Sequence, residues 1–365
     1  MWMVGGEGGI RTLGTREGTT VFETAAFDHS ATSPAARARA AVIARAGALA
    51  KPNQGLPYPE GMQSRPRWVY MRAMSREFHI APDPDDERLS RPVTGIDQDG
   101  RPVVQHVVHE RPLTIFLNSQ EVVTAMTIGD HPDWLAVGYL VNQGMLTHRD
   151  EITGIDHDED LGVVVVRTSG RTDFEEKMKK KVRTSGCAQG TVFGDIMETF
   201  ETIELSAGAT LRTSWLYALM KQINTAPSLY LKAGAIHGCV LAQGDRVLAY
   251  IEDVGRHNAV DKIAGWMFLN GVRPHDKIFY TTGRLTSEMV IKTVQMRIPI
   301  LISRSGFTAW GVELARQADL TLIGRARGKR FVALAGEERI VFDADVAAVE
   351  EEDRRFRRKA AVDEG

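Results

Sequence analysis

Residues 252–262 read Glu-Asp-Val-Gly-Arg-His-Asn-Ala-Val-Asp-Lys, a run in which seven of eleven side chains are polar or ionisable. The preceding residues, 246–251, are rich in β-branched and aromatic side chains and predict a strand. The following residues place Trp266 and its apolar neighbours on one face of a helix. In open α/β sheets, ligands bind at the edge where strands lead into helices. The alternative is a purely structural run, in which Asp253 caps the helix and Arg256 pairs with an acid.

Strands and helices alternate along the second half of the chain. The predicted strands are 229–232, 247–251, 277–280, 299–302, 320–323 and 331–335, and the predicted helices begin at His257, Leu285 and Thr308. This alternation is typical of a largely parallel sheet covered by helices on both faces. A smaller α+β domain is predicted upstream, with one helix over 134–141 and strands at 103–108, 113–117, 122–127, 152–155 and 163–166.

These patterns divide the chain into five regions. They are a disordered extension at 1–90, a small α+β domain at 91–170, a linker and cysteine loop with helices at 171–228, an α/β domain at 229–345 and a charged tail at 346–365. The first region has little apolar periodicity, so burial cannot offset the entropy of ordering it. Met71 or Met74 is then expected to lie nearer the true start of the protein.

Composition limits the class of protein. With 45 basic and 47 acidic residues, the net charge of -2 does not favour a general nucleic-acid binder. No apolar run approaches the ~18 residues of a transmembrane helix. The N-terminus also lacks the pattern of a secretory signal. A cytoplasmic protein with no membrane or nucleic-acid partner is expected.

The chain has two cysteines, too few for a disulfide scaffold or an all-cysteine zinc site. Cys187 follows Thr-Ser-Gly and a lysine run at 179–181. Glycine permits close approach of another molecule and positive charge favours the thiolate, so Cys187 is predicted to be an exposed nucleophile. Cys239 lies in the apolar stretch 235–241 and is predicted to belong to the core.

Three loops that follow predicted strands combine glycine with arginine, at 282–284, 304–306 and 324–330. Helix N-termini and forked guanidinium groups both favour phosphate, so three such loops at adjacent strand ends predict an anion-binding site. The alternative for the last loop is a solvated basic turn without a ligand.

These motifs resemble those of the FdhD family, the accessory sulfurtransferases of formate dehydrogenase maturation. The resemblance extends over roughly residues 90–345 and includes 183–187 (Arg-Thr-Ser-Gly-Cys), 235–238 (Ala-Ile-His-Gly), 282–284, 287–288 and 320–324 besides the run at 252–262. It implies a three-layer sheet domain similar to that of cytidine deaminases. The deaminase zinc site is not expected, because residue 239 is cysteine and no Pro-Cys-x-x-Cys motif is present, and no metal ligand is predicted.

The resemblance also implies a function. Cys187 would accept sulfur from a cysteine desulfurase as a persulfide and pass it to the molybdenum or tungsten cofactor, bis-molybdopterin guanine dinucleotide, before that cofactor enters formate dehydrogenase. Many family members have Cys-x-x-Cys here, whereas this chain has Cys187-Ala-Gln-Gly190, which puts in doubt any mechanism that needs a local disulfide. The alternative is a chaperone that binds the cofactor or a nucleotide without moving sulfur. A homodimer is also implied.

By the same resemblance, residues 229–345 form the cofactor-binding domain. The implied contact residues are His237, Arg256, His257, Gly283, Arg284, Arg325, Ala326, Arg327, Gly328, Lys329 and Arg330. His237 has two interpretations of equal weight: a strand-end histidine bonded within the fold, or a side chain that orients the bound cofactor.

Overall fold

The computed structural model describes residues 80–147, 150–169 and 193–345, all within the compact unit formed by residues 44–365. The predicted cysteine loop around Cys187, the predicted charged tail and most of the predicted N-terminal extension lie outside the described residues. Among the helices in these described ranges, none is long and apolar enough to cross a membrane.

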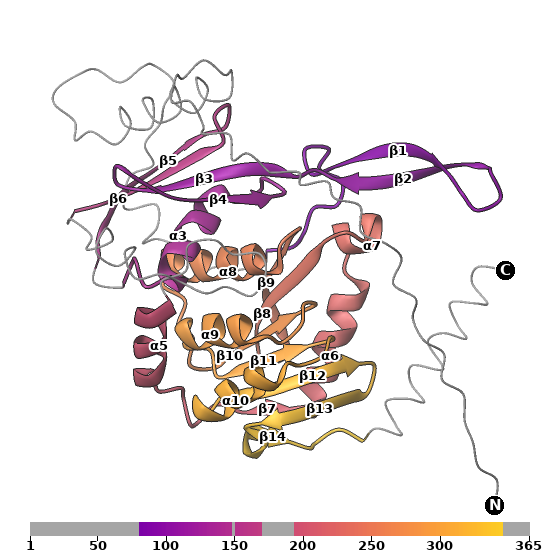
Figure 1. The fold of residues 1–365 in the computed structure, drawn as a ribbon. Helices are drawn as coiled ribbons and strands as arrows, with labels where there is room; N and C mark the ends of the chain where they lie inside the picture. Colours follow the sequence, from indigo (N-terminus) through magenta and orange to yellow (C-terminus); the bar gives the residue numbers. More distant parts are fainter. Residues whose placement is uncertain (1–79, 148–149, 170–192, 346–365) are drawn as a thin grey trace, which may run out of the picture. The chain divides into compact units, whose positions relative to one another are not determined.

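A four-stranded sheet with one helix forms the first part of the described chain, which we call the small domain (Figure 1). Its strands are β3 (Arg111–Leu117), β4 (Gln120–Thr127), β5 (Ile152–Asp158) and β6 (Val163–Thr168), in the order β4-β3-β6-β5. Helix α3 (Pro132–Asn142) packs its buried Leu135 and Leu140 against this sheet. The apolar run of β6 is fully buried because both faces of that strand are covered, as its sequence predicts.

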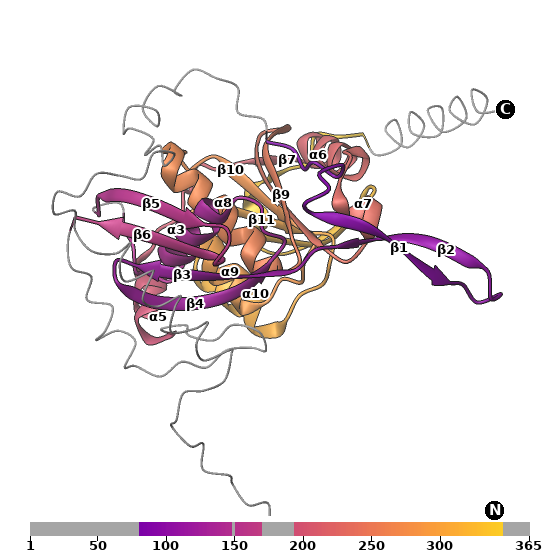
Figure 2. The ribbon, with the colours of Figure 1, turned by 90° about the horizontal axis from the view of Figure 1, so that it is seen from above.

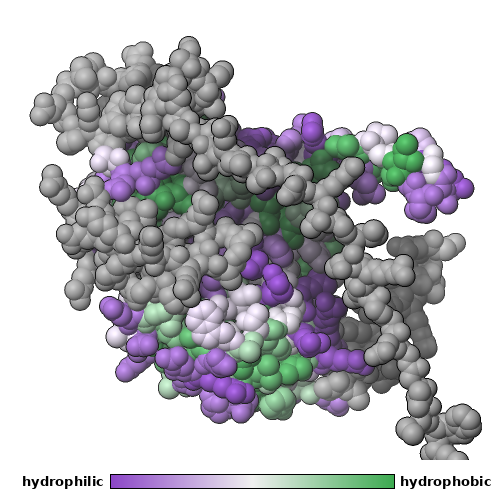
Figure 3. Space-filling model, in the orientation of Figure 1, coloured by the Kyte–Doolittle hydropathy of each residue, from purple (hydrophilic) through white to green (hydrophobic). Residues whose placement is uncertain are grey.

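A two-stranded antiparallel ribbon precedes the small domain (Figure 2). It consists of β1 (Ser90–Ile96) and β2 (Pro102–Val108), of which only the second was predicted from the sequence. Within the described ranges these strands pair only with each other. The ribbon exposes apolar side chains, including 75% of Ile96 and 61% of Val104 (Figure 3).

The six-stranded sheet of the second part, which we call the large domain, is mixed rather than largely parallel. Its strands are β8 (His237–Gln243), β9 (Arg246–Asp253), β10 (Lys277–Thr281), β11 (Ile300–Ser303), β12 (Thr321–Arg327) and β13 (Arg330–Ala335), in the order β13-β12-β11-β10-β8-β9. Only β10, β11 and β12 run parallel. Tight turns with left-handed Gly244 and Gly328 join β8 to β9 and β12 to β13, and such short connections require antiparallel neighbours. The expectation of a largely parallel sheet was therefore wrong for both ends of the sheet.

Helices cover both faces of the large sheet. One face packs against α5 (Phe193–Thr202), α8 (Arg256–Asn270), α9 (Ser287–Gln295) and α10 (Ala309–Gln317), and the other against α6 (Thr213–Thr225). Side chains of β8 alternate between the two cores, with Cys239 facing the α8 side and Val240 the α6 side. Short strands β7 (Leu211–Arg212) and β14 (Ile340–Val341) pair beside α6, and the 3-10 helix η1 (Glu337–Arg339) precedes β14.

Residues 229–232, predicted as a strand, form the helix α7 (Leu229–Ala233). The hydroxyl of Ser228 accepts a hydrogen bond from the amide of Leu231, as an N-cap does. The buried carboxylate of Glu252 accepts two more, from the amides of Leu229 and Tyr230. A contact from a distant strand thus satisfies the helix N-terminus, and the local apolar pattern could not show it.

The small domain meets the large domain where α3 crosses α8. A β-carbon added to Gly138 of α3 would lie 1.6 Å from the carbonyl oxygen of Asp261, and one added to Gly265 of α8 would lie 2.0 Å from that of Trp134. Both helices therefore need glycine at the crossing point. Beside it, Asn142 of α3 donates a 2.7 Å hydrogen bond to the buried carboxylate of Asp261.

Candidate functional site

All six strands of the large sheet have a terminus at one edge, since the hairpin from β12 to β13 turns there as well. The first residue of β8, His237, pairs with Asp253, the last residue of β9. Thr281 at the end of β10 pairs with Ser303 at the end of β11, and β12 continues in parallel register. We call this edge, together with the head of α8, the strand-end site. It brings together the predicted residues 256–257, 283–284 and 325–330 with His237.

The segment after β10 is bonded tightly to its neighbours. The Thr282 hydroxyl accepts a 3.0 Å hydrogen bond from the amide of Gly238 and lies 3.4 Å from Nδ1 of His237. The Gly283 amide donates to the hydroxyl of Thr281 at 3.1 Å. The amide of Gly283 is therefore used within the fold, and we expect the guanidinium of the exposed Arg284 to be the group offered to an anion.

The head of α8 packs directly against this segment. A β-carbon on Gly283 would lie 2.9 Å from Cδ of Arg256, so glycine is needed for the close approach of the two elements. Nε2 of His257 lies 3.0 Å from Oε2 of Glu288, in the first turn of α9. One part of the structural alternative for the polar run was wrong, because the N-cap of α8 is Gly255 and not Asp253. The other part, the pairing of Arg256 with an acid, stays a prediction.

Both histidines of the site are neutral at neutral pH. Burial lowers the pKa of His237, and the positive charges near it, first that of Arg256 and also that of Arg284, lower it further. Burial likewise lowers the pKa of His257, although the contact with Glu288 acts in the opposite direction. The positive charge of the strand-end site therefore comes from guanidinium groups and the ammonium group of Lys329, and not from imidazoles.

The predicted basic turn is the hairpin between β12 and β13. Strand β12 extends to Arg327, four residues beyond its predicted end, with Arg325 in the left-handed region at φ 54°. The amide of Arg325 donates to the carbonyl of Ser305 at 2.7 Å, and Nε of Arg327 donates to that of Arg304 at 3.3 Å. These bonds hold the hairpin against the segment that follows β11.

The side chains of this hairpin differ in their exposure to solvent, and therefore in whether they can contact a ligand. Arg325, Arg327, Gly328 and Arg330 are exposed, whereas Ala326 is buried in the core on the α6 side. Ala326 can therefore offer a ligand no side-chain contact. Nζ of the half-buried Lys329 lies 5.0 Å from the ring centroid of Tyr217 in α6, a cation–π distance.

Arg304, which belongs to the predicted anion-binding loop 304–306, lies at the same edge together with Tyr230, which was not predicted. The guanidinium carbon of Arg304 lies 5.4 Å from the ring centroid of Tyr230. Nearby, burial raises the pKa of Tyr280 to about 12. Tyr230 was missed because its helix was taken for a strand, although Ser228 directly before the apolar residues is a helix N-cap signal.

Cys239 has the properties predicted for a core residue. Its side chain is 0% exposed, and its thiol donates to the hydroxyl of Thr281 at 3.4 Å. Burial raises the pKa of Cys239 to about 12, so almost no thiolate forms at neutral pH. Cys187, predicted to carry the chemistry, lies outside the described residues.

Comparison with known proteins places these features in a family. The sequence model of the FdhD/NarQ family matches residues 108–341. The chain is 32% identical over 245 residues to the sulfur carrier protein FdhD of Bacillus subtilis, covering 65% of this chain and 91% of that protein. The protein of the same name from Bacillus pumilus is 30% identical over 241 residues, covering 64% of this chain and 90% of that protein.

A solved structure is also similar. The crystal structure of a protein assigned as a formate dehydrogenase accessory protein from Desulfotalea psychrophila is 28% identical, with a TM-score of 0.57. The match covers 69% of this chain and all of that protein. Sequence and fold agree, and the chain belongs to the FdhD/NarQ family.

Proposed function

We propose that this chain is a sulfur carrier in the maturation of formate dehydrogenase. Cys187 accepts sulfur from a cysteine desulfurase as a persulfide and passes it to bis-molybdopterin guanine dinucleotide, the substrate of the transfer, before formate dehydrogenase receives it. The names of the relatives support this role. The burial of Cys239 supports the assignment of Cys187, since the sequence has only these two cysteines.

The strand-end site is proposed to bind the cofactor, and one observation carries this proposal. Guanidinium groups from separate loops, those of Arg256, Arg284, Arg304 and Arg327, are gathered at one edge of the sheet. Guanidinium groups form charge-assisted, often bidentate bonds to phosphate oxygens, and the cofactor carries two pyrophosphates. The neutral imidazoles of His237 and His257 can each donate or accept a hydrogen bond beside these charges.

The remaining details are proposals of the same kind. The protein is proposed to act in the cytoplasm as a homodimer that meets both the desulfurase and the dehydrogenase. The three layers of the large domain support the proposed likeness to the cytidine deaminase fold. A persulfide is more acidic than a thiol, so the lysines at 179–181 would keep it anionic and ready for transfer.

Binding of GDP tests the cofactor site. GDP should bind in calorimetry and more weakly as salt rises, whereas guanosine, which lacks phosphate, should show little salt dependence. Arg327→Ala should weaken GDP binding by about 1.5–3 kcal/mol, the contribution of a charged hydrogen bond. The matched control is Arg316→Ala, which removes an exposed arginine that also donates from Nε to a backbone carbonyl, but on α10. Unchanged GDP affinity in Arg327→Ala and Arg256→Ala, with folding intact, would refute the site.

Mass spectrometry tests the sulfur carrier role. After incubation with a cysteine desulfurase and cysteine, the peptide containing Cys187 should gain one sulfur atom. Sulfur found only on Cys239 would contradict the assignment. GDP binding without any persulfide would instead favour the cofactor chaperone, the alternative suggested by the single cysteine of Cys187-Ala-Gln-Gly190.

A further inference from the structure

The carboxylate of Asp253, the last residue of β9, holds the turn that leads into α8. The side chain is 0% exposed, and its Oδ1 accepts hydrogen bonds from the amide of Gly255 at 3.1 Å and from Nδ2 of Asn258 at 3.0 Å. Gly255 and Asn258 flank Arg256 and His257. One buried carboxylate thus ties down both ends of the turn that supplies these two residues to the strand-end site.

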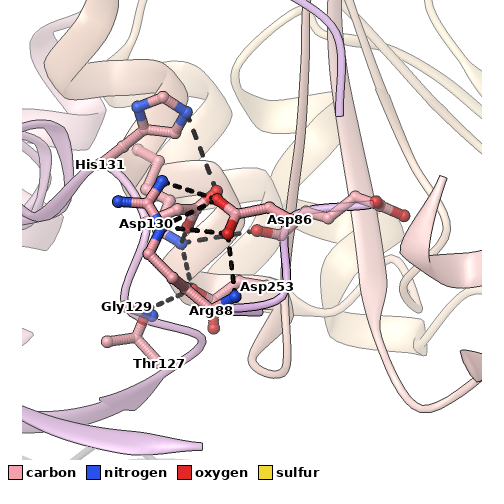
Figure 4. A network of polar contacts seen from close by, with 9 residues as sticks. Asp86, Arg88, Thr127, Gly129, Asp130, His131 and Asp253 are labelled. Atoms are coloured by element: carbon pink, nitrogen blue, oxygen red, sulfur yellow. Dashed lines mark hydrogen bonds and ion pairs between the residues drawn. The ribbon is translucent and has the colours of Figure 1, made fainter. Parts of the chain in front are cut away.

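The other oxygen of Asp253 is held in part by the small domain (Figure 4). Oδ2 accepts a 2.5 Å hydrogen bond from the hydroxyl of Thr127, the last residue of β4. The preceding residue of β4 takes part as well, because the carbonyl of Met126 accepts a 2.6 Å bond from Nδ2 of Asn258. The end of β4 is therefore bonded to both sides of the α8 turn.

Lys262 of α8 pairs with the acids on either side of this contact. Its side chain is 0% exposed, and Nζ pairs with Asp253 at 2.5 Å and with the partly exposed Asp130, which follows β4. Burial by itself would lower the pKa of Lys262, but the two carboxylates raise it above its ordinary value. The cluster therefore holds a lysine cation between two acids, and charges buried in this way need all their partners.

We propose that the small domain positions the anion-binding residues of the strand-end site. Thr127 and Asp130 act as positioning residues through Asp253 and Lys262, and they hold the α8 turn so that Arg256 and His257 face the bound phosphate groups. This inference rests on the proposed binding of the cofactor at that site. It assigns to β4 and the loop after it a role in binding, although neither supplies a residue to the strand-end site.

The test compares two substitutions of Thr127, one that removes its hydroxyl and one that keeps it. Thr127→Val keeps the shape of the side chain and removes the donor to Asp253, whereas Thr127→Ser keeps the donor. Thr127→Val should raise the Kd for GDP roughly five- to tenfold, because the apparent affinity falls with the fraction of molecules whose turn is in place. Thr127→Ser should stay within about twofold of the wild type on the same argument.

Two further measurements separate positioning from general stability. Thr124→Val, on the same strand, removes a hydroxyl whose hydrogen-bond partner among the described residues is Thr114 of the small domain, and it should leave GDP affinity unchanged. In the Arg256→Ala background, Thr127→Val should add a smaller loss than in the wild type, because one of the two residues that it positions is already gone. Melting temperatures are recorded for every variant, and Asp130→Asn serves as the second probe if Thr127→Val does not fold.

The outcomes are distinct. If the wild-type protein binds GDP and Thr127→Val binds it with the same Kd, the positioning role alone is overturned. Where Asp130→Asn replaces Thr127→Val, the same comparison applies to Asp130→Asn. The positioning role would also be overturned if Thr127→Val lowered GDP affinity by the same factor in the wild-type and Arg256→Ala backgrounds. Absence of GDP binding by the wild-type protein would overturn the proposed cofactor site and this inference with it.

Discussion

Replacing Gly138 with alanine should weaken the attachment of the small domain to α8. The added β-carbon would lie 1.6 Å from the backbone oxygen of Asp261, whereas real contacts of this type essentially never fall under 3.0 Å. Because the obstacle is backbone rather than a flexible side chain, the helices must separate by about 1.4 Å at their crossing. That movement would also stretch the hydrogen bond from Asn142 to Asp261.

The expected magnitude follows from two opposing effects. Overpacking of this kind costs about 1–3 kcal/mol and occasionally more, and a clash with backbone belongs at the upper end. Alanine favours the helix over glycine by about 1 kcal/mol, which offsets part of the loss. We expect the free energy of unfolding to fall by about 2 kcal/mol. For a unit of this size each kcal/mol lowers Tm by roughly 2–4 °C, so Tm should fall by about 4–8 °C.

Calorimetry and urea denaturation of the purified protein measure this effect. The control is Gly154→Ala in β5, where an added β-carbon meets nothing within 4 Å. Its free energy of unfolding should stay within about 0.5 kcal/mol of the wild type. A Gly138→Ala protein as stable as the wild type would show that the crossing can relax without cost, and the close approach of α3 and α8 would then explain nothing about stability.

Other expectations concern the cysteines, the N-terminus and pH. Cys187→Ala should abolish activation of formate dehydrogenase in a maturation assay, whereas Cys239→Ala should retain it, since the thiol of Cys239 is buried with a raised pKa. Deleting residues 1–70 should leave Tm and sulfur transfer essentially unchanged, and a large drop in Tm would contradict the predicted disorder. Below its ordinary pKa of 6.5, unfolded His257 binds a proton that the buried residue resists, so stability falls as pH falls. His257→Gln should therefore make the loss of Tm between pH 7 and pH 5 shallower.

Periodicity in the sequence predicted those elements whose own residues carry the pattern. The strands around Val163 and Leu301 and the helix after Gly255 lie where their apolar spacing placed them. Helix α6 lies in the region 171–228, which was predicted to contain helices but without their bounds, although Leu216, Leu219, Met220 and Ile223 have the spacing of one helical face. Strand β1 was missed for a different reason, since Pro92 and Gly95 interrupt its pattern and it forms only by pairing with β2.

The sequence could predict which loops meet at the candidate site, because the direction of the strands determines that, but not the contacts between side chains. The carboxyl ends of parallel strands share an edge, so the meeting of residues 282–284, 304–306 and 324–330 followed from the strand order alone. The contacts of Arg304 with Tyr230 and of His257 with Glu288 could not be foreseen. Each joins residues from separate elements, and their approach depends on how helices pack rather than on any local pattern.

The polar run at 252–262 contains buried residues that hold the turn and residues that the turn presents at the strand-end site. Because the two kinds follow each other closely, many charged residues lie in one short segment. Asp253, Asp261 and Lys262 are buried and bonded to side chains of other elements. Arg256 lies between them at the strand-end site. A turn at a sheet edge has little apolar surface to hold it, so buried ion pairs on either side must fix it instead. The structural and the functional interpretations of the run are therefore compatible, because the buried charges hold the turn that presents the binding residues.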